Sequence, residues 1–197
     1  GSIRMVEGTS ISHGLAGGFD RPNLLLCFMV DDIGSALARV HSAGGRAEAP
    51  TSAPYGLIAN CVDDDGTPFA LFQPPAGRAE PRPAINGTRN GDVSYITMEV
   101  RDSAQARAFY GSVLGWQFAP GHVEDGWAPA DVAPMAGMHG GHALATVVPM
   151  YRVDDIHTAV RAVRAEGGRA TDPEQQSYGL SAECVDDQGT HFYLGQH

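Results

Sequence analysis

The sequence contains no lysine, only three cysteines and no long apolar run, and each shortage excludes a class of protein. Its 13 basic side chains are all arginine and its formal net charge is -10, so it lacks the basic stripe of proteins that bind nucleic acid or anionic membranes. Cys27, Cys61 and Cys184 form no C-x-x-C pair, which favours buried reduced thiols. Because no signal peptide or bilayer-spanning stretch is found, we expect a cytoplasmic location.

What the sequence does contain is a long internal repeat at an offset of 123 residues, as between Val30 and Val153. Val30-Asp31-Asp32-Ile33 recurs as Val153-Asp154-Asp155-Ile156, and Cys61-Val62-Asp63-Asp64 recurs as Cys184-Val185-Asp186-Asp187. The match has no gap and continues to Gln73 in the first copy and Gln196 in the second. A gapless match of this length predicts two structurally equivalent units.

Each copy is predicted to form a β-α-β-β-β module. Apolar runs at 23–30 and 146–153 indicate strands, and the Asp pair after each run can cap a helix. Apolar residues then recur at helical spacing. Gly44-Gly45 and Gly167-Gly168 supply the left-handed end of the helix, and three short strands follow.

A related unit lies between the two copies. Residues 92–100 alternate in the manner of a strand, and Asp102 or Ser103 can cap the helix that follows. Two further strands are expected before Gly141. The segment 74–91 is rich in Pro, Gly and Arg, which predicts a linker.

These units define the expected domain organisation. The N-terminal half is 1–73, with a partial first module and the module 23–73, and the C-terminal half is 92–197, with the modules 92–142 and 143–197. By the offset, Gly14 corresponds to Gly137, so the chain opens inside a hairpin. The first module is therefore expected to lack its opening strand, its helix and its second strand.

Two motifs resemble a known superfamily. Phe109-Tyr110, followed by Val113-Leu114-Gly115-Trp116 after a strand ending in Val100-Arg101-Asp102, resembles the first helix of vicinal oxygen chelate proteins. The motif at 153–156 resembles their partner module. The superfamily includes glyoxalase I, extradiol dioxygenases, epimerases, fosfomycin-resistance enzymes and metal-free drug-sequestering proteins of the bleomycin-resistance type. The resemblance implies an α+β fold of tandem βαβββ modules, whose curved mixed sheets form cups with ligands on the concave side.

The resemblance also assigns positions for metal ligands. Metal-using relatives place a His or Gln in the first strand of a module and a Glu or Gln in its last strand. The corresponding positions are Tyr95, Val148 and Tyr193 in the C-terminal half, and Leu25 and Ala70 in the module before it. None of these side chains is a usual ligand of a divalent metal. We therefore expect no metal and no other cofactor.

Strand alternation separates a core face from a cup face. Phe28, Phe69 and Leu71, with Tyr151, Phe192 and Leu194 in the second copy, are apolar in both copies and are expected beneath the helices. The side chains expected to bind a ligand in the C-terminal cup are Tyr95, Thr97, Glu99, Val148, Met150, Arg152, His191 and Tyr193. Aromatic walls, methionine and a few polar groups suit a flat, amphipathic small molecule. The alternative is a packed cup with Glu99 paired to Arg152 at its rim.

Other motifs are given structural roles. The acids of Asp63-Asp64-Asp65-Gly66 are consecutive, and no bidentate Glu follows, so this is a turn and not a calcium loop. His139 and His142 flank a glycine pair and are expected to be exposed loop residues.

The sequence favours a metal-free small-molecule binding protein of the bleomycin-resistance type, a type associated with bacterial antibiotic resistance. The alternatives are a metal-dependent glyoxalase- or dioxygenase-like enzyme, with His139 or His191 as a ligand, and a metal-free enzyme with Tyr95, His191 or Tyr193 as acid or base. A structural protein with filled cups is a further hypothesis. The expected partner is a small-molecule ligand, without nucleic acid or membrane. The open edge of the incomplete module is expected to be covered by another chain, as in a homodimer, or to be disordered.

Overall fold

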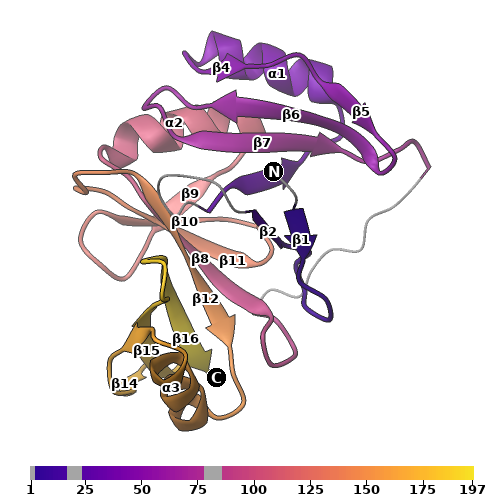
Figure 1. The fold of residues 1–197 in the computed structure, drawn as a ribbon. Coiled ribbons are helices and arrows are strands. Elements are labelled where there is room, and N and C mark those ends of the chain that lie inside the picture. The colour runs from indigo at the N-terminus through magenta and orange to yellow at the C-terminus, as the bar shows by residue number, and fades with distance from the viewer. Residues whose placement is uncertain (1–2, 17–23, 78–85) are drawn as a thin grey trace.

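A computed structural model describes residues 3–16, 24–77 and 86–197, which form three α-helices and three β-sheets (Figure 1). The helices are α1 (Ile33–Ser42), α2 (Ser103–Leu114) and α3 (Ile156–Ala165). Each begins after an aspartate whose side chain accepts hydrogen bonds from N–H groups of the first turn. These caps are Asp32, Asp102 and Asp155, as predicted.

The C-terminal half forms one mixed sheet of nine strands. Their order is β13-β15-β16-β12-β8-β11-β10-β9, and β14 also pairs with β15. The bounds are β8 (Val93–Glu99), β9 (Phe118–Pro120), β10 (Gly126–Pro129), β11 (Met135–His139), β12 (Thr146–Arg152), β13 (Arg169–Ala170), β14 (Glu174–Gln176), β15 (Gly179–Val185) and β16 (His191–Gln196). The first strands of the two modules, β8 and β12, pair antiparallel at the centre, and the last strand of each module lies parallel to its first.

The N-terminal half forms a smaller sheet of a single module. Its order is β3-β7-β6-β4, and β5 also pairs with β6. The bounds are β3 (Leu26–Met29), β4 (Arg46–Ala47), β5 (Thr51–Ala53), β6 (Gly56–Val62) and β7 (Pro68–Gln73). A separate hairpin joins β1 (Ile3–Met5) to β2 (Gly14–Ala16). Among the described strands, β3 therefore lies at a sheet edge, whereas its counterpart β12 lies at a sheet centre.

The repeat extends to the register of the strands. In β3 and β7, Phe28 lies opposite Leu71, and in β12 and β16, Tyr151 lies opposite Leu194, which are the same positions shifted by the repeat offset. The helices also end alike, because both copies have a left-handed glycine in the turn after the helix. The predicted α+β fold of repeated modules is confirmed.

The structure differs from the prediction in the short strands. The strand expected after each helix is split in two, into β4 and β5 in the first copy and β13 and β14 in the second. Pro50 and Pro173 lie at the breaks. Proline has no N–H to donate to the strand ladder, so it interrupts pairing. The middle module also has three strands after α2 where two were predicted.

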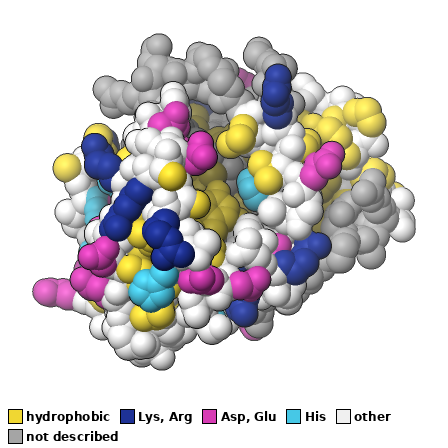
Figure 2. Space-filling view, turned by 60° about the horizontal axis from the view of Figure 1, so that its bottom comes forward, with side chains coloured by type: hydrophobic (Ala, Val, Ile, Leu, Met, Phe, Trp, Pro, Cys, Tyr) yellow, Lys and Arg dark blue, Asp and Glu magenta, His cyan; other side chains and the backbone are white. Residues whose placement is uncertain are grey.

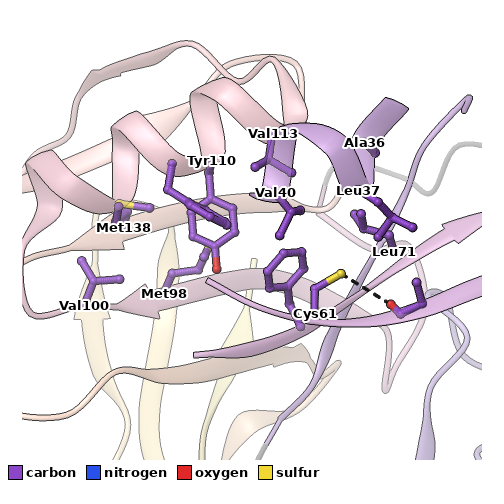
Figure 3. Packing of buried hydrophobic residues seen from close by; sticks show 14 of the residues in the cluster. Ala36, Leu37, Val40, Cys61, Leu71, Met98, Val100, Tyr110, Val113 and Met138 are labelled. Atoms are coloured by element: carbon purple, nitrogen blue, oxygen red, sulfur yellow. Dashed lines mark hydrogen bonds between the residues drawn. The ribbon is translucent and has the colours of Figure 1, made fainter. Parts of the chain in front are cut away.

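One hydrophobic core joins the two halves. Helices α1 and α2 pack against each other, and Figure 3 shows buried side chains of both, including Val40 and Val113, above the strands. The rings of Phe28 and Phe69 lie 5.9 and 6.0 Å from the ring of Tyr110 on α2. The predicted core face of the N-terminal module is therefore confirmed, and its core continues across the linker predicted at 74–91.

Hydrogen bonds link the turn between β6 and β7 in the N-terminal half to α2 and to Arg101 just before it. Its aspartates at 63–65 accept hydrogen bonds, in order, from Tyr110 Oη at 3.1 Å, Gln105 Nε2 at 3.0 Å and the Arg101 guanidinium at 3.1 Å. These consecutive acids therefore have a structural role in this turn.

The three cysteines are free thiols. Cys61 and Cys184 are buried as predicted, and burial raises the pKa of each thiol to about 11. The prediction is wrong for Cys27, which is exposed because β3 is an edge strand. None of the described helices is long and apolar enough to cross a membrane.

Candidate ligand-binding site

The concave face of the C-terminal sheet is centred on β8 and β12. Residues directly opposite each other in paired strands point to the same side of a sheet. The antiparallel register of these two strands therefore brings their alternate side chains together as cross-strand pairs. The pairs on this face are Tyr95 with Met150, Thr97 with Val148 and Glu99 with Thr146.

A cavity of ≈ 450 Å³ lies at the Glu99 end of β8, within the size range of small-molecule pockets. Four of the predicted site residues line it, namely Glu99, Val148, His191 and Tyr193. The space-filling view shows a hollow in the molecular surface with hydrophobic side chains at its floor (Figure 2).

Several lining residues were not identified from the sequence, among them Leu24, Thr146, Glu183 and Thr190. Glu183 could have been found from the turn at Gly189. That turn sets Val185 opposite His191, and hence Glu183 opposite Tyr193. Leu24 could not have been found, because it comes from the other half of the chain.

Two of the remaining predicted residues, Tyr95 and Met150, lie on the concave face but do not line the cavity. A Cβ atom at Gly137 would lie 2.2 Å from Tyr95 Oη, and one at Gly195 would lie 2.7 Å from the sulfur of Met150. Glycine at these two positions leaves the space that the larger side chains occupy. Tyr95 is half-buried and Met150 is buried, and Thr97 beside them is also half-buried outside the cavity.

Arg152 lies at the opposite end of β12 from the cavity. Its backbone N–H donates to the carbonyl of Asp92 at 2.8 Å, and its Nε is buried without a hydrogen-bond partner among the described residues. Glu99 lies opposite Thr146, so the pairing of Glu99 with Arg152 considered above is wrong. The first strands of the two modules run antiparallel, so corresponding residues of the modules lie at opposite ends.

Tyr193 lies beside carboxylates at the cavity wall. Burial raises the pKa of Tyr193, and the negative charges of Glu183 and Glu99 and a hydrogen bond to Glu183 raise it further. The phenol is therefore protonated at neutral pH and acts as a hydrogen-bond donor.

Three polar side chains lie along the rim from Glu99. Thr146 Oγ1 donates to the Glu99 carboxylate, and His142 Nδ1 lies 3.7 Å from Glu99 Oε2. The other nitrogen of that imidazole, Nε2, lies 2.8 Å from His139 Nδ1. His142 lies in a loop as expected, but His139 is the last residue of β11 beside Glu99, and neither imidazole is fully exposed because both are half-buried.

The side chains at the family's metal-ligand positions do not fit a divalent metal. Two of these positions hold protonated phenols, Tyr95 and Tyr193, and the third holds the aliphatic Val148. In the N-terminal module, Leu25 is exposed and Ala70 is buried, and neither has a donor atom in its side chain. Across residues 3–16, 24–77 and 86–197, no three His, Cys, Asp or Glu side chains are placed to hold a metal ion together. The polar groups that do face the cavity suit hydrogen bonds to an organic molecule.

No protein-family model and no curated protein matches the sequence. Solved structures do match it. A catechol 2,3-dioxygenase is 17% identical with a TM-score of 0.60, over 87% of this chain and 67% of that one. A 2,3-dioxygenase from Pseudomonas is 11% identical with a TM-score of 0.62, over 91% of this chain and 73% of that one.

The Mn(II)-bound glyoxalase from Novosphingobium aromaticivorans is 15% identical with a TM-score of 0.61, over 86% of this chain and 61% of that one. This chain thus spans less than two thirds of that glyoxalase. At such low identity the likeness concerns the fold. Together with the paired modules and their central antiparallel strands, it shows that this chain has the same α+β fold as these dioxygenases and this glyoxalase.

Proposed function

We propose that this chain is a small-molecule binding protein of the glyoxalase and bleomycin-resistance type, which holds its ligand in the C-terminal cup without a metal ion. The observation that supports this function best is the composition of the cavity wall. Val148 and Tyr193 line it at two of the positions where metal-using relatives place ligands. The cavity volume suits an organic ligand of moderate size.

The wall also indicates the chemistry of the ligand. Leu24, Val148 and the ring of Tyr193 offer apolar and aromatic contact, whereas Glu99 and Glu183 offer hydrogen-bond acceptors. An aromatic or amphipathic molecule with a hydroxyl or amino group toward these carboxylates would satisfy both parts of the wall. The Tyr193 hydroxyl, which donates to Glu183, can accept a hydrogen bond from a donor on the same ligand.

A metal-dependent or metal-free enzyme of this fold is the second candidate. The observation that favours it is the cluster of His139, His142 and Glu99, in which two hydrogen-bonded imidazoles lie near a carboxylate at the cavity wall. Imidazoles and carboxylates are groups that act as general acids or bases. The binding protein remains our first choice, because no three His, Cys, Asp or Glu side chains of the described residues, this cluster included, are placed to hold a metal ion together.

The proposal is tested first on the protein as purified, without a chelator or a nickel column. Native mass spectrometry should show a co-purified organic molecule, and elemental analysis should show no stoichiometric metal. Titration with zinc, nickel, manganese and ferrous iron should leave the melting temperature unchanged. A stoichiometric metal that is lost on changing Glu99 or His191 would instead establish the enzyme.

Tyr193→Phe should weaken binding of the co-purified molecule roughly 5- to 30-fold, because it removes one hydrogen bond inside the cavity, worth about 1–2 kcal/mol. The fold should be unaffected, since the ring remains. Tyr55→Phe is the matched control, because Tyr55 is exposed in the other half of the chain. Equal affinities of the two variants, measured by calorimetry, would place the ligand elsewhere.

A further inference from the structure

We propose that the imidazoles of His139 and His142 form a proton-sensitive contact, which holds the loop 140–145 closed while at least one imidazole is neutral and releases it when both are protonated. The centroids of the two rings lie 4.8 Å apart, and His142 Nε2 lies 2.8 Å from His139 Nδ1. One nitrogen of this pair donates a proton and the other accepts it through a lone pair. The contact therefore requires an unprotonated nitrogen on one of the rings.

The imidazole pair spans the start of the loop that joins β11 to β12. His139 is the last residue of β11, and Gly141, with a left-handed φ of 83°, turns the chain so that the ring of His142 meets that of His139. The N–H groups of Gly141 and His142 donate to the carbonyls of Arg101 and Val100, each at 3.1 Å. The middle of the loop is exposed, so it buries little surface of its own. Loss of the imidazole contact therefore removes a large part of what holds this loop.

A carboxylate lies beside each imidazole. Glu99 Oε2 on β8 lies 3.7 Å from His142 Nδ1. On the other side, a hydrogen bond from Ser103 lowers the pKa of Asp125, and the nearby charge of His139 also contributes to this shift. A first proton on the pair is therefore stabilised by a carboxylate. It also leaves the contact intact, because an imidazolium donates a strong hydrogen bond to a neutral imidazole.

A second proton breaks the contact. It occupies the accepting nitrogen, so that two N–H groups and two positive charges face each other across 2.8 Å. The positive charges of Arg101 beside the loop and Arg107 beside Asp125 further disfavour this state. The open loop thus binds one more proton than the closed loop, and the equilibrium shifts toward the open loop as the pH falls. Since imidazoles change charge between about pH 5 and pH 8, opening belongs to mild acid.

The opening of the loop affects the cavity through Glu99. Glu99 and Thr146 both line the cavity, and Thr146 Oγ1, just after the loop, donates to the Glu99 carboxylate. The His142 imidazolium, once separated from His139, pairs with Glu99 and occupies the acceptor that faces the cavity. This step rests on the proposed function, in which Glu99 accepts a hydrogen bond from the ligand. Mild acid should therefore weaken ligand binding.

The first measurement follows backbone hydrogen exchange at Gly141 and His142 in the full chain, from about pH 8 to about pH 5. Both N–H groups are hydrogen-bonded in the closed loop, so their protection reports its opening. After correction for the intrinsic pH dependence of exchange, we expect this protection to fall roughly 10-fold or more in mild acid. Amides of β8 and β12 should keep their protection, because the sheet persists. Unchanged protection at the two loop amides would overturn the proposal.

A variant isolates the effect of the second proton. His139→Asn places an amide oxygen near the position of Nδ1, and this oxygen accepts a hydrogen bond but does not titrate. We expect the loop of this variant to stay protected throughout the pH range. His157→Asn is the matched control, because His157 is exposed on α3, and it should respond as wild type does. A His139→Asn loop that opens in acid like wild type would contradict the inference.

Two readouts on the wild-type protein need no variant. Nitrogen NMR of the imidazoles should show the pair taking up protons in two steps separated by about one pH unit or more, and a single shared step would overturn the proposal. Affinity for the co-purified molecule, measured by calorimetry, should fall roughly 10-fold over the same pH interval. An affinity independent of pH would refute the link to Glu99. If no molecule co-purifies, the proposed function fails, whereas hydrogen exchange and NMR still decide the role of the imidazole pair.

Discussion

At the residue scale, the repeat provides a matched pair of core positions in Phe69 and Phe192. The sequence alone predicts the same cost for removing either ring. The structure shows that Phe69 is 1% exposed among the rings of Phe28, Phe109 and Tyr110, whereas Phe192 is half-buried at the cavity. The difference arises because α2 covers the first copy only.

We therefore expect Phe69→Ala to lower the free energy of unfolding by roughly 3–5 kcal/mol, because it leaves a cavity in the core. Phe192→Ala should cost only about 1–2 kcal/mol, because solvent already reaches that ring. Urea denaturation of both variants measures the two costs. Equal losses would show that the rings are equally packed in solution.

At the scale of elements, the docking of α2 on the β6–β7 turn depends on a buried hydrogen bond. Tyr110 Oη donates to Asp63 at 3.1 Å, and both residues are buried. Burial raises the pKa of Asp63, although N–H groups of the turn and the Tyr110 hydroxyl partly oppose this. A raised pKa means that the Asp63 carboxyl binds a proton more readily in the folded state than in the unfolded state. The charge that Asp63 carries at neutral pH therefore lowers the stability of the fold. This cost disappears as the pH falls through the raised pKa toward 3.8.

Tyr110→Phe should accordingly cost about 1–3 kcal/mol at neutral pH, because a buried carboxylate loses a donor. The cost should be smaller in acid, because removing the Tyr110 hydroxyl costs less when Asp63 is a neutral carboxyl than when it is a buried carboxylate. Denaturation curves at several pH values measure this trend, with exposed Tyr55→Phe as the control. A cost that does not change with pH would mean that Asp63 stays protonated throughout.

At the scale of the whole molecule, Asp92 joins the opening segment of the chain to the C-terminal sheet. Its buried carboxylate accepts hydrogen bonds from the N–H groups of Ser10 at 2.7 Å, Thr88 at 2.9 Å and Arg89 at 3.0 Å. Burial alone would raise its pKa, but these donors and the nearby Arg89 charge outweigh burial and lower it to about 2.

Asp92→Ala should lower stability by about 2–4 kcal/mol at neutral pH, because several N–H groups lose their acceptor. A depressed carboxyl pKa stabilises the fold above its unfolded value of 3.8, and this stabilisation is lost as the pH falls from 3.8 toward 2. The difference between wild type and variant should therefore narrow over that interval. Unfolding free energies across it provide the test, and a constant difference would contradict the assigned role.

The sequence by itself determined the modules, their repeat and most of their helix ends. These features depend on neighbours along the chain, such as an aspartate before a helix or a glycine after it. Even a longer-range contact recurs in both copies, since Gln73 accepts a hydrogen bond from Ile33 N and Gln196 from Ile156 N, each at 2.8 Å. The same residues at matching positions of the repeat therefore form the same hydrogen bond in both copies.

Only the tertiary structure decided the pairing between modules, and with it the site. The antiparallel joint of β8 and β12 separates Arg152 from Glu99 and brings Glu99 to Thr146 and the two histidines. Four of the eight predicted site residues lie at the cavity, and Tyr95 and Met150 fill space that Gly137 and Gly195 leave open. Alternation along a strand fixes which face a side chain takes, but which side chains meet on that face depends on register between strands far apart in the sequence.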